Sequence, residues 1–99
     1  MQYIVMAYDG TDEKAPERRL AVREEHLKSV EKRFNDREHL YGAAMCDDDG
    51  KMIGSMMVVD YPSREALDNW LEVEPYVVGD VWRKIAIQPC KVAPLFMKP

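Results

Sequence analysis

Two residues from distant parts of the chain could together move a proton. His26 is one of only two histidines, and Glu74 precedes a proline in a later segment. An imidazole changes its charge near neutral pH, and a carboxylate in contact with it can orient the ring and stabilise its charged form. The sequence therefore offers His26 as a candidate general base and Glu74 as its partner, provided that the fold brings the two segments together.

Each of these residues also has an ordinary structural explanation. On ideal helix geometry His26 lies at the margin of an apolar stripe, where it could be a boundary histidine between core and solvent. Glu74 could equally be a solvated carboxylate. The other histidine, His39, follows the first predicted helix, and we expect it at the surface or in a helix cap.

The first half of the chain predicts a strand followed by a long helix. Residues 2–8 are apolar and rich in β formers, and the segment from Pro16 to about Arg37 has helical composition. Arg23 falls within the apolar stripe of that helix, which indicates either a kink or a polar pocket at the core edge. Four apolar residues share the stripe and are expected to face the core: Leu20, Leu27, Val30 and Phe34.

The second half predicts three strands and a second helix. Residues 39–45 and 52–61 are strands, and Asp49-Gly50 in the turn between them provides the positive φ angles of a hairpin. Ser63 is a helix cap, Pro75 ends that helix, and residues 82–87 form the last strand. The apolar face of the second helix comprises Ala66, Leu67, Trp70 and Leu71.

The resulting order, β-α-β-β-α-β, is that of a ferredoxin-like α+β fold with a four-stranded antiparallel sheet and two helices on one face. We expect a single domain over residues 1–99. The uncovered sheet face would expose apolar strand residues, and such a patch on a small protein usually marks an interface. The sequence therefore predicts a homodimer packed sheet to sheet.

Composition argues against several classes of partner and cofactor. The net charge is −4 over 99 residues and basic residues alternate with acidic ones, so nucleic acid is not an expected partner. Cys46 and Cys90 are too far apart for a CxxC motif, the glycines are scattered, and Asp47 to Asp49 suit a solvated hairpin tip. We expect no metal, no cofactor, no signal peptide, no membrane span and a cytoplasmic protein.

Two segments resemble the YCII-related (YciI-like) family. Arg23-Glu24-Glu25-His26-Leu27 is similar to the family's Arg-x-x-His-Leu segment, and Glu74-Pro75-Tyr76 is similar to its Asp-Pro-Tyr segment. Gly54-Ser55 resembles the Gly-Ser pair of the family's third strand. The resemblance implies a ferredoxin-like fold, a dimeric α+β barrel assembly and a pocket centred on a histidine and an aspartate. Glu74 departs from the family's aspartate by one methylene.

The resemblance implies two alternative functions. One is a cofactor-independent lyase, such as a dehydrochlorinase, or a hydrolase that acts on a small aromatic or quinol-type substrate. His26 would then be the general base and Glu74 its orienting carboxylate, with Arg23, Ser55 and Tyr76 binding the substrate. The other is a non-catalytic dimeric module that binds a small anion or metabolite.

Overall fold

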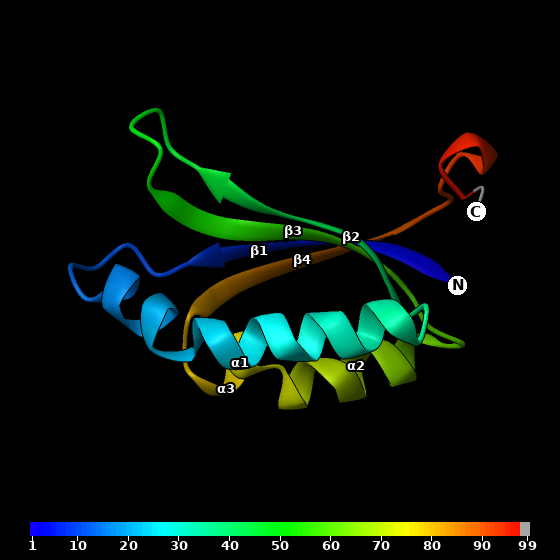
Figure 1. The fold of residues 1–99 in the computed structure, drawn as a ribbon, viewed down its shortest axis with the longest axis horizontal. Coiled ribbons are helices and arrows are strands. Elements are labelled where there is room, and N and C mark those ends of the chain that lie inside the picture. The colour runs from blue at the N-terminus through cyan, green and yellow to red at the C-terminus, as the bar shows by residue number, and fades with distance from the viewer. Residues whose placement is uncertain (98–99) are drawn as a thin grey trace.

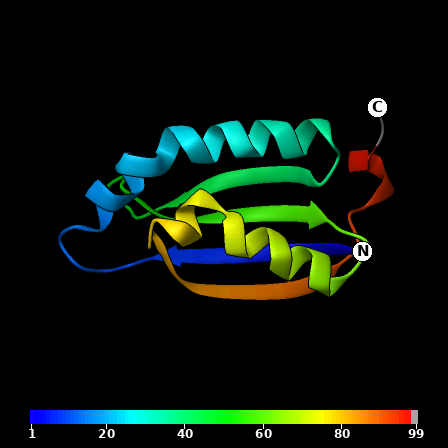
Figure 2. The same ribbon diagram turned by 90° about the horizontal axis from the view of Figure 1, so that it is seen from below.

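The computed structural model describes residues 1–97 as a four-stranded antiparallel sheet with helices on one face (Figures 1 and 2). The strand order is β2-β3-β1-β4, and the ferredoxin-like α+β fold predicted from the sequence is confirmed. The elements follow the chain as β1 (Gln2–Asp9), α1 (Ala15–Asn35), β2 (His39–Cys46), β3 (Met52–Asp60), α2 (Arg64–Val73), α3 (Pro75–Val78) and β4 (Trp82–Cys90), before a 3-10 turn at Pro94–Met97.

Local signals in the sequence set several of these boundaries. The hydroxyl of Ser63 accepts a hydrogen bond from the Ala66 N–H at 3.1 Å, which confirms it as the N-cap of α2. Glu74 has the extended backbone expected before a proline and separates α2 from α3. Of the predicted hairpin pair, Gly50 takes a positive φ of 84°, whereas Asp49 does not.

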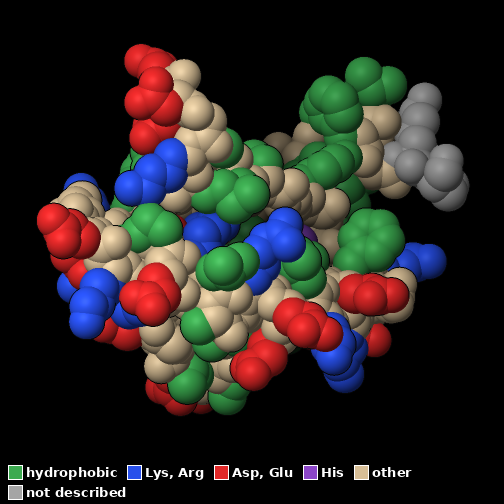
Figure 3. Space-filling model, turned by 60° about the vertical axis from the view of Figure 1, so that its left-hand side comes forward, with side chains coloured by type: hydrophobic (Ala, Val, Ile, Leu, Met, Phe, Trp, Pro, Cys, Tyr) green, Lys and Arg blue, Asp and Glu red, His purple; other side chains and the backbone are tan. Residues whose placement is uncertain are grey.

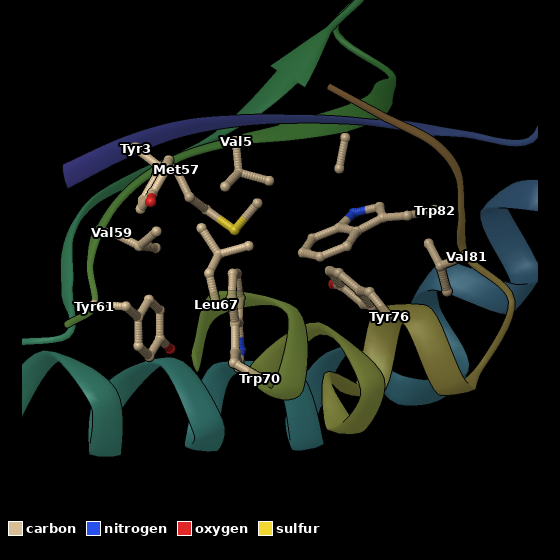
Figure 4. Close-up of a cluster of buried hydrophobic side chains, with 11 residues drawn as sticks. Tyr3, Val5, Met57, Val59, Tyr61, Leu67, Trp70, Tyr76, Val81 and Trp82 are labelled. Carbon is tan, nitrogen blue, oxygen red and sulfur yellow. The ribbon is translucent and has the colours of Figure 1, made fainter. Parts of the chain in front are cut away.

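The hydrophobic core lies between the sheet and the helix layer (Figure 4). Alternate residues of β1, Tyr3, Val5 and Ala7, point toward the helices, and the opposite-facing residues of that strand do not reach the core. Leu67 and Trp70 of α2 meet them from the other side, as the predicted apolar face requires. No helix within residues 1–97 combines the length and apolar character needed to cross a lipid bilayer.

The second face of the sheet carries no helix (Figure 1). Its residues include the half-buried Ile4 and Met6 of β1 and Met56 and Val58 of β3, which pair with each other across the two strands. Tyr41 of β2 is 41% exposed beside them. Apolar strand residues are therefore open on this face, as the sequence predicts.

The predicted burial of α1 was wrong. The apolar stripe of this helix faces away from the core, with Leu20 at 74% and Phe34 at 61% exposure. The buried face instead carries Ala15, Arg19, His26 and Arg33. Buried polar side chains are tolerated when they are paired, and the partners of these residues come from distant elements.

The predicted position of His39 was also wrong. It begins a strand, as expected, but it is only 3% exposed and neither ring nitrogen has a hydrogen-bond partner within residues 1–97. A register shift in the β2–β3 pairing between His39 and Tyr41 accompanies this placement. Burial, reinforced by the nearby Arg33 charge, lowers the pKa of His39 to about 4.

Acid should therefore destabilise the fold through His39. The pKa in the folded protein, about 4, lies below the ordinary 6.5, so as the pH falls the unfolded chain binds this proton first. The contribution of neutral His39 to the free energy of unfolding is fully present above about pH 6.5. It falls by about 2 kcal/mol by about pH 4.5. Urea unfolding at both pH values should show a smaller acid loss for His39→Leu than for the natural chain. An equal loss in both proteins would contradict this prediction.

Candidate active site

His26 and Glu74 meet beneath the sheet, on the helix side. Nδ1 of His26 contacts Oε1 of Glu74, and both side chains are buried. The contact joins the middle of α1 to the junction of α2 and α3, where Pro75 holds the preceding residue in an extended conformation. The two segments singled out in the sequence are thus in direct contact.

The carboxylate of Glu74 receives donors on both of its oxygens and has no exposed surface. Besides His26, the backbone N–H of Tyr76 donates to Oε1 at 3.3 Å. Arg33 Nη2 and the indole N–H of Trp70 donate to Oε2 at 3.1 and 3.2 Å. An ionised carboxylate accepts about four hydrogen bonds, so its acceptor capacity is filled.

Neighbouring aromatic rings hold the His26 imidazole in place. The Tyr76 ring stacks on it with a centroid separation of 3.9 Å and an interplanar angle of 13°, and Trp82 meets its edge at 5.8 Å. Because a carboxylate only accepts, Nδ1 carries the hydrogen of the His26–Glu74 bond. The Glu74 contact leaves the other nitrogen, Nε2, free to act as the acceptor, and His26 lines a cavity.

A cavity of about 550 Å³ lies between α1 and the strands β2 and β3. Figure 3 shows basic and hydrophobic side chains side by side in the hollow between the helix layer and the sheet. The polar lining includes Arg19, Arg23, His26, Ser55 and Tyr76. The apolar lining includes Leu27, Val30 and Phe34 of the α1 stripe, and Met57 of β3. The volume and mixed lining suit a small organic molecule.

A second buried ion pair supports one wall of this cavity. Arg19 Nη1 donates to both carboxylate oxygens of Asp9, at 2.9 and 3.0 Å, and the two side chains are 8% and 4% exposed. The other arm of Arg19, Nη2, donates to Oγ of Ser55 at 3.0 Å. Trp82 Nε1 donates to the same oxygen at 3.2 Å.

These contacts leave the Ser55 hydroxyl hydrogen available. A hydroxyl has two acceptor lone pairs and one hydrogen, and Arg19 and Trp82 occupy both lone pairs. Ser55 also lines the cavity, so its hydrogen can be donated to a bound molecule. The preceding residue, Gly54, allows β3 to lie this close to β1. A Cβ at Gly54 would be only 2.5 Å from the carbonyl oxygen of Ala7 on β1.

The other two predicted substrate-binding residues, Arg23 and Tyr76, differ in their exposure to solvent. Arg23 is exposed and lines the rim of the cavity. Tyr76 is buried, and this burial raises the pKa of its phenol while Arg19 and Arg23 oppose the shift. The phenol therefore stays neutral near pH 7, with its ring against His26.

Sequence reasoning missed five residues of the site. Trp70 was expected only on the apolar face of the second helix and Trp82 only as the start of the last strand, yet each directs its indole N–H to a polar site residue. The other three are Asp9, Arg19 and Arg33. One signal was available: Arg19, His26 and Arg33 recur every seven residues, which places them on one helix face.

Comparison with known proteins gives a consistent family and fold. The family model described as the YCII-related domain matches residues 1–91. Protein YciI of Escherichia coli O6:H1 is 29% identical over 92% of this chain and 97% of its own length. An uncharacterised protein of Haemophilus influenzae is also 29% identical, with the same coverage of both chains.

Solved structures with low sequence identity share the fold. The 5-chloro-2-hydroxyhydroquinone dehydrochlorinase of Burkholderia phenoliruptrix AC1100, in complex with 2,5-dihydroxybenzoquinone, superposes with a TM-score of 0.82. It is 16% identical, and the match covers 96% of this chain and 98% of that one. Protein Atu4242 of Agrobacterium tumefaciens gives a TM-score of 0.52 at 13% identity, with 94% of each chain covered.

Proposed function

Because the chain belongs to the YCII-related family, we propose that it is a cofactor-independent enzyme that moves a proton on a small organic substrate. The reaction class is that of a lyase, such as a dehydrochlorinase, or of a hydrolase. One observation carries the proposal: His26 contacts a buried carboxylate through Nδ1 and also lines a cavity. A small aromatic or quinol-type molecule, neutral or anionic, fits the size and lining of the cavity.

The proposed chemistry begins at Nε2 of His26. The neutral imidazole accepts a proton from the substrate, and the Glu74 carboxylate stabilises the imidazolium that forms. In an elimination, the electron pair that the proton leaves behind on the substrate forms a new double bond, and the leaving group departs with the electron pair of its own bond. The substrate thereby loses the elements of an acid, such as HCl.

Three other cavity residues would bind the substrate. The Ser55 hydroxyl, which accepts from a guanidinium and an indole, would donate to a substrate oxygen on which negative charge develops. Arg23 at the rim would attract an anionic group. Tyr76 would supply a neutral phenol and a flat aromatic surface beside His26.

Incubation with a panel of phenols, quinols, chlorinated quinols and lactones tests the proposal. We expect at least one compound to be converted, with a product that has lost the elements of an acid or gained those of water. Binding to the cavity without conversion of any compound would contradict the enzyme proposal and favour the binding module. Cavity occupancy is checked by perturbation of the NMR signals of His26 and Ser55.

We also propose that two copies of the chain pack through their uncovered sheet faces. The half-buried apolar residues of β1 and β3 on that face support this arrangement. Sedimentation at micromolar concentration should give about twice the 11.5 kDa chain mass. Met56→Glu, which places a charge on this face, should shift the protein toward the monomer, whereas the exposed Glu25→Gln on α1 should not. A natural chain that sediments at 11.5 kDa would contradict the proposal.

A further inference from the structure

Arg33 is the buried cation beside the dyad that the proposed reaction leaves without a role. It lies about two helical turns after His26 on α1, and its side chain is 7% exposed. Its Nη2 donates to Oε2 of Glu74 at 3.1 Å, and its guanidinium lies 4.4 Å from the centre of the Trp70 ring. A buried charge is costly unless it is paired, and Glu74 provides the pair.

Glu74 is therefore shared between two neighbours with different chemistry. Its Oε1 contacts an imidazole that can gain a proton, and its Oε2 contacts a guanidinium that is already charged. Burial lowers the pKa of Arg33 and the Glu74 carboxylate opposes this shift, but a guanidinium stays protonated in proteins. When His26 is neutral the charges of Arg33 and Glu74 cancel. When it is protonated, one uncompensated positive charge is buried.

We propose that Arg33 is a positioning residue that compensates the charge of Glu74 and so keeps His26 available as a neutral base. Oε1 of Glu74 then holds the Nδ1 hydrogen of His26, and Nε2 stays unprotonated. Without Arg33, the full carboxylate charge would stabilise the imidazolium, which cannot accept a proton. The inference rests on the proposed role of His26, but its test needs no substrate.

The other polar groups around His26 do not replace Arg33. Arg19 is balanced by Asp9, and Arg23 and Glu31 are exposed to solvent at the cavity rim. Burial keeps His39 and Tyr76 neutral near pH 7, because it lowers the pKa of the first and raises that of the second. Ser55 and Trp82 carry no charge. Arg33 is thus the cation in direct contact with the dyad carboxylate.

An NMR titration of the His26 ring tests this role. Arg33→Gln should raise the pH midpoint of the His26 titration by about one unit or more, because the Glu74 charge is no longer compensated. Trp70→Phe is the matched control, since it removes a neutral donor from the same carboxylate oxygen. It should move the midpoint by less than half as much. A midpoint unchanged in Arg33→Gln, or an equal shift in both variants, would overturn the proposal.

Arg33→Lys separates charge from shape. A lysine keeps the positive charge while it loses the planar guanidinium. We expect its His26 midpoint to return most of the way from the Arg33→Gln value to the natural one. A lysine variant that titrates like the glutamine variant would show that charge is not what matters, and would overturn the proposal.

A second comparison applies if Arg33→Gln does not fold. Glu74→Gln alone leaves the Arg33 charge beside His26, whereas Glu74→Gln with Arg33→Gln leaves neither charge and no unpaired buried ion. The His26 midpoint should be higher in the double variant by about one unit or more. Equal midpoints would overturn the role of Arg33. Turnover of the natural chain is measured separately, so a failure of the proposed reaction is distinguishable from a failure of this inference.

Discussion

His26→Gln should lower turnover by about 10²–10⁴-fold, with the fold intact. Glutamine keeps a polar side chain near Glu74 but cannot accept and release a proton at neutral pH. The measurement is the initial rate with a substrate from the phenol, quinol and lactone panel, together with the urea midpoint of the same protein. Ligand binding should persist, since Ser55 and Arg23 are untouched.

Glu25→Gln is the matched control for this variant. Glu25 is exposed and adjacent to His26 on α1, so it tests the effect of a glutamine substitution on the same helix. We expect its turnover to stay near that of the natural chain. Near-normal turnover in His26→Gln would remove His26 from the mechanism.

Asp9→Asn should destabilise the fold by about 3–5 kcal/mol, because it leaves the Arg19 charge buried without a carboxylate. Both side chains of this pair are less than one-tenth exposed and share two hydrogen bonds. Urea unfolding measures the loss. Asp68→Asn is the control, because it breaks the exposed Arg64–Asp68 pair and should cost under about 1 kcal/mol.

A double variant shows whether the Asp9 effect comes from the unpaired charge. In Asp9→Asn with Arg19→Met neither charge remains, so the loss should be smaller than the sum of the two single losses by about 1–3 kcal/mol. Strictly additive losses, or a single Asp9→Asn loss as small as that of Asp68→Asn, would contradict the interpretation.

The fold could be predicted because its signals are local. The Asp49-Gly50 turn, the Ser63 cap and the proline after Glu74 act within a few residues, and the apolar face of α2 follows from spacing alone. The β-α-β-β-α-β order then limits the topology to few arrangements. The ferredoxin-like prediction depended on these signals.

The orientation of α1 could not be predicted because its determinants are not local. An apolar stripe is expected to face the core, yet α1 turns Arg19, His26 and Arg33 inward. Their carboxylate partners, Asp9 and Glu74, come from β1 and from the end of α2. The spacing of apolar residues along one helix carries no information about ion pairs that form between different elements.

The candidate site was predictable only in part for the same reason. The contact of His26 with Glu74 was suggested by family resemblance, since the spacing within this chain does not bring the two together. His39 was assigned to the surface or a helix cap because it follows the first predicted helix, whereas the β2–β3 register shift accompanies its placement in the interior. Arg33 shares the seven-residue spacing of Arg19 and His26, but its pairing with Glu74 follows only from the folded structure.

The most direct test of the account is the tautomer of His26 in the free protein, read from the two ring nitrogens by ¹⁵N NMR at about pH 7.5. We predict a neutral ring with its hydrogen on Nδ1, toward Glu74, and an unprotonated Nε2. A ring with its hydrogen on Nε2, or one that carries hydrogens on both nitrogens at this pH, would contradict the proposal that His26 is a base ready to accept a proton from a molecule in the cavity.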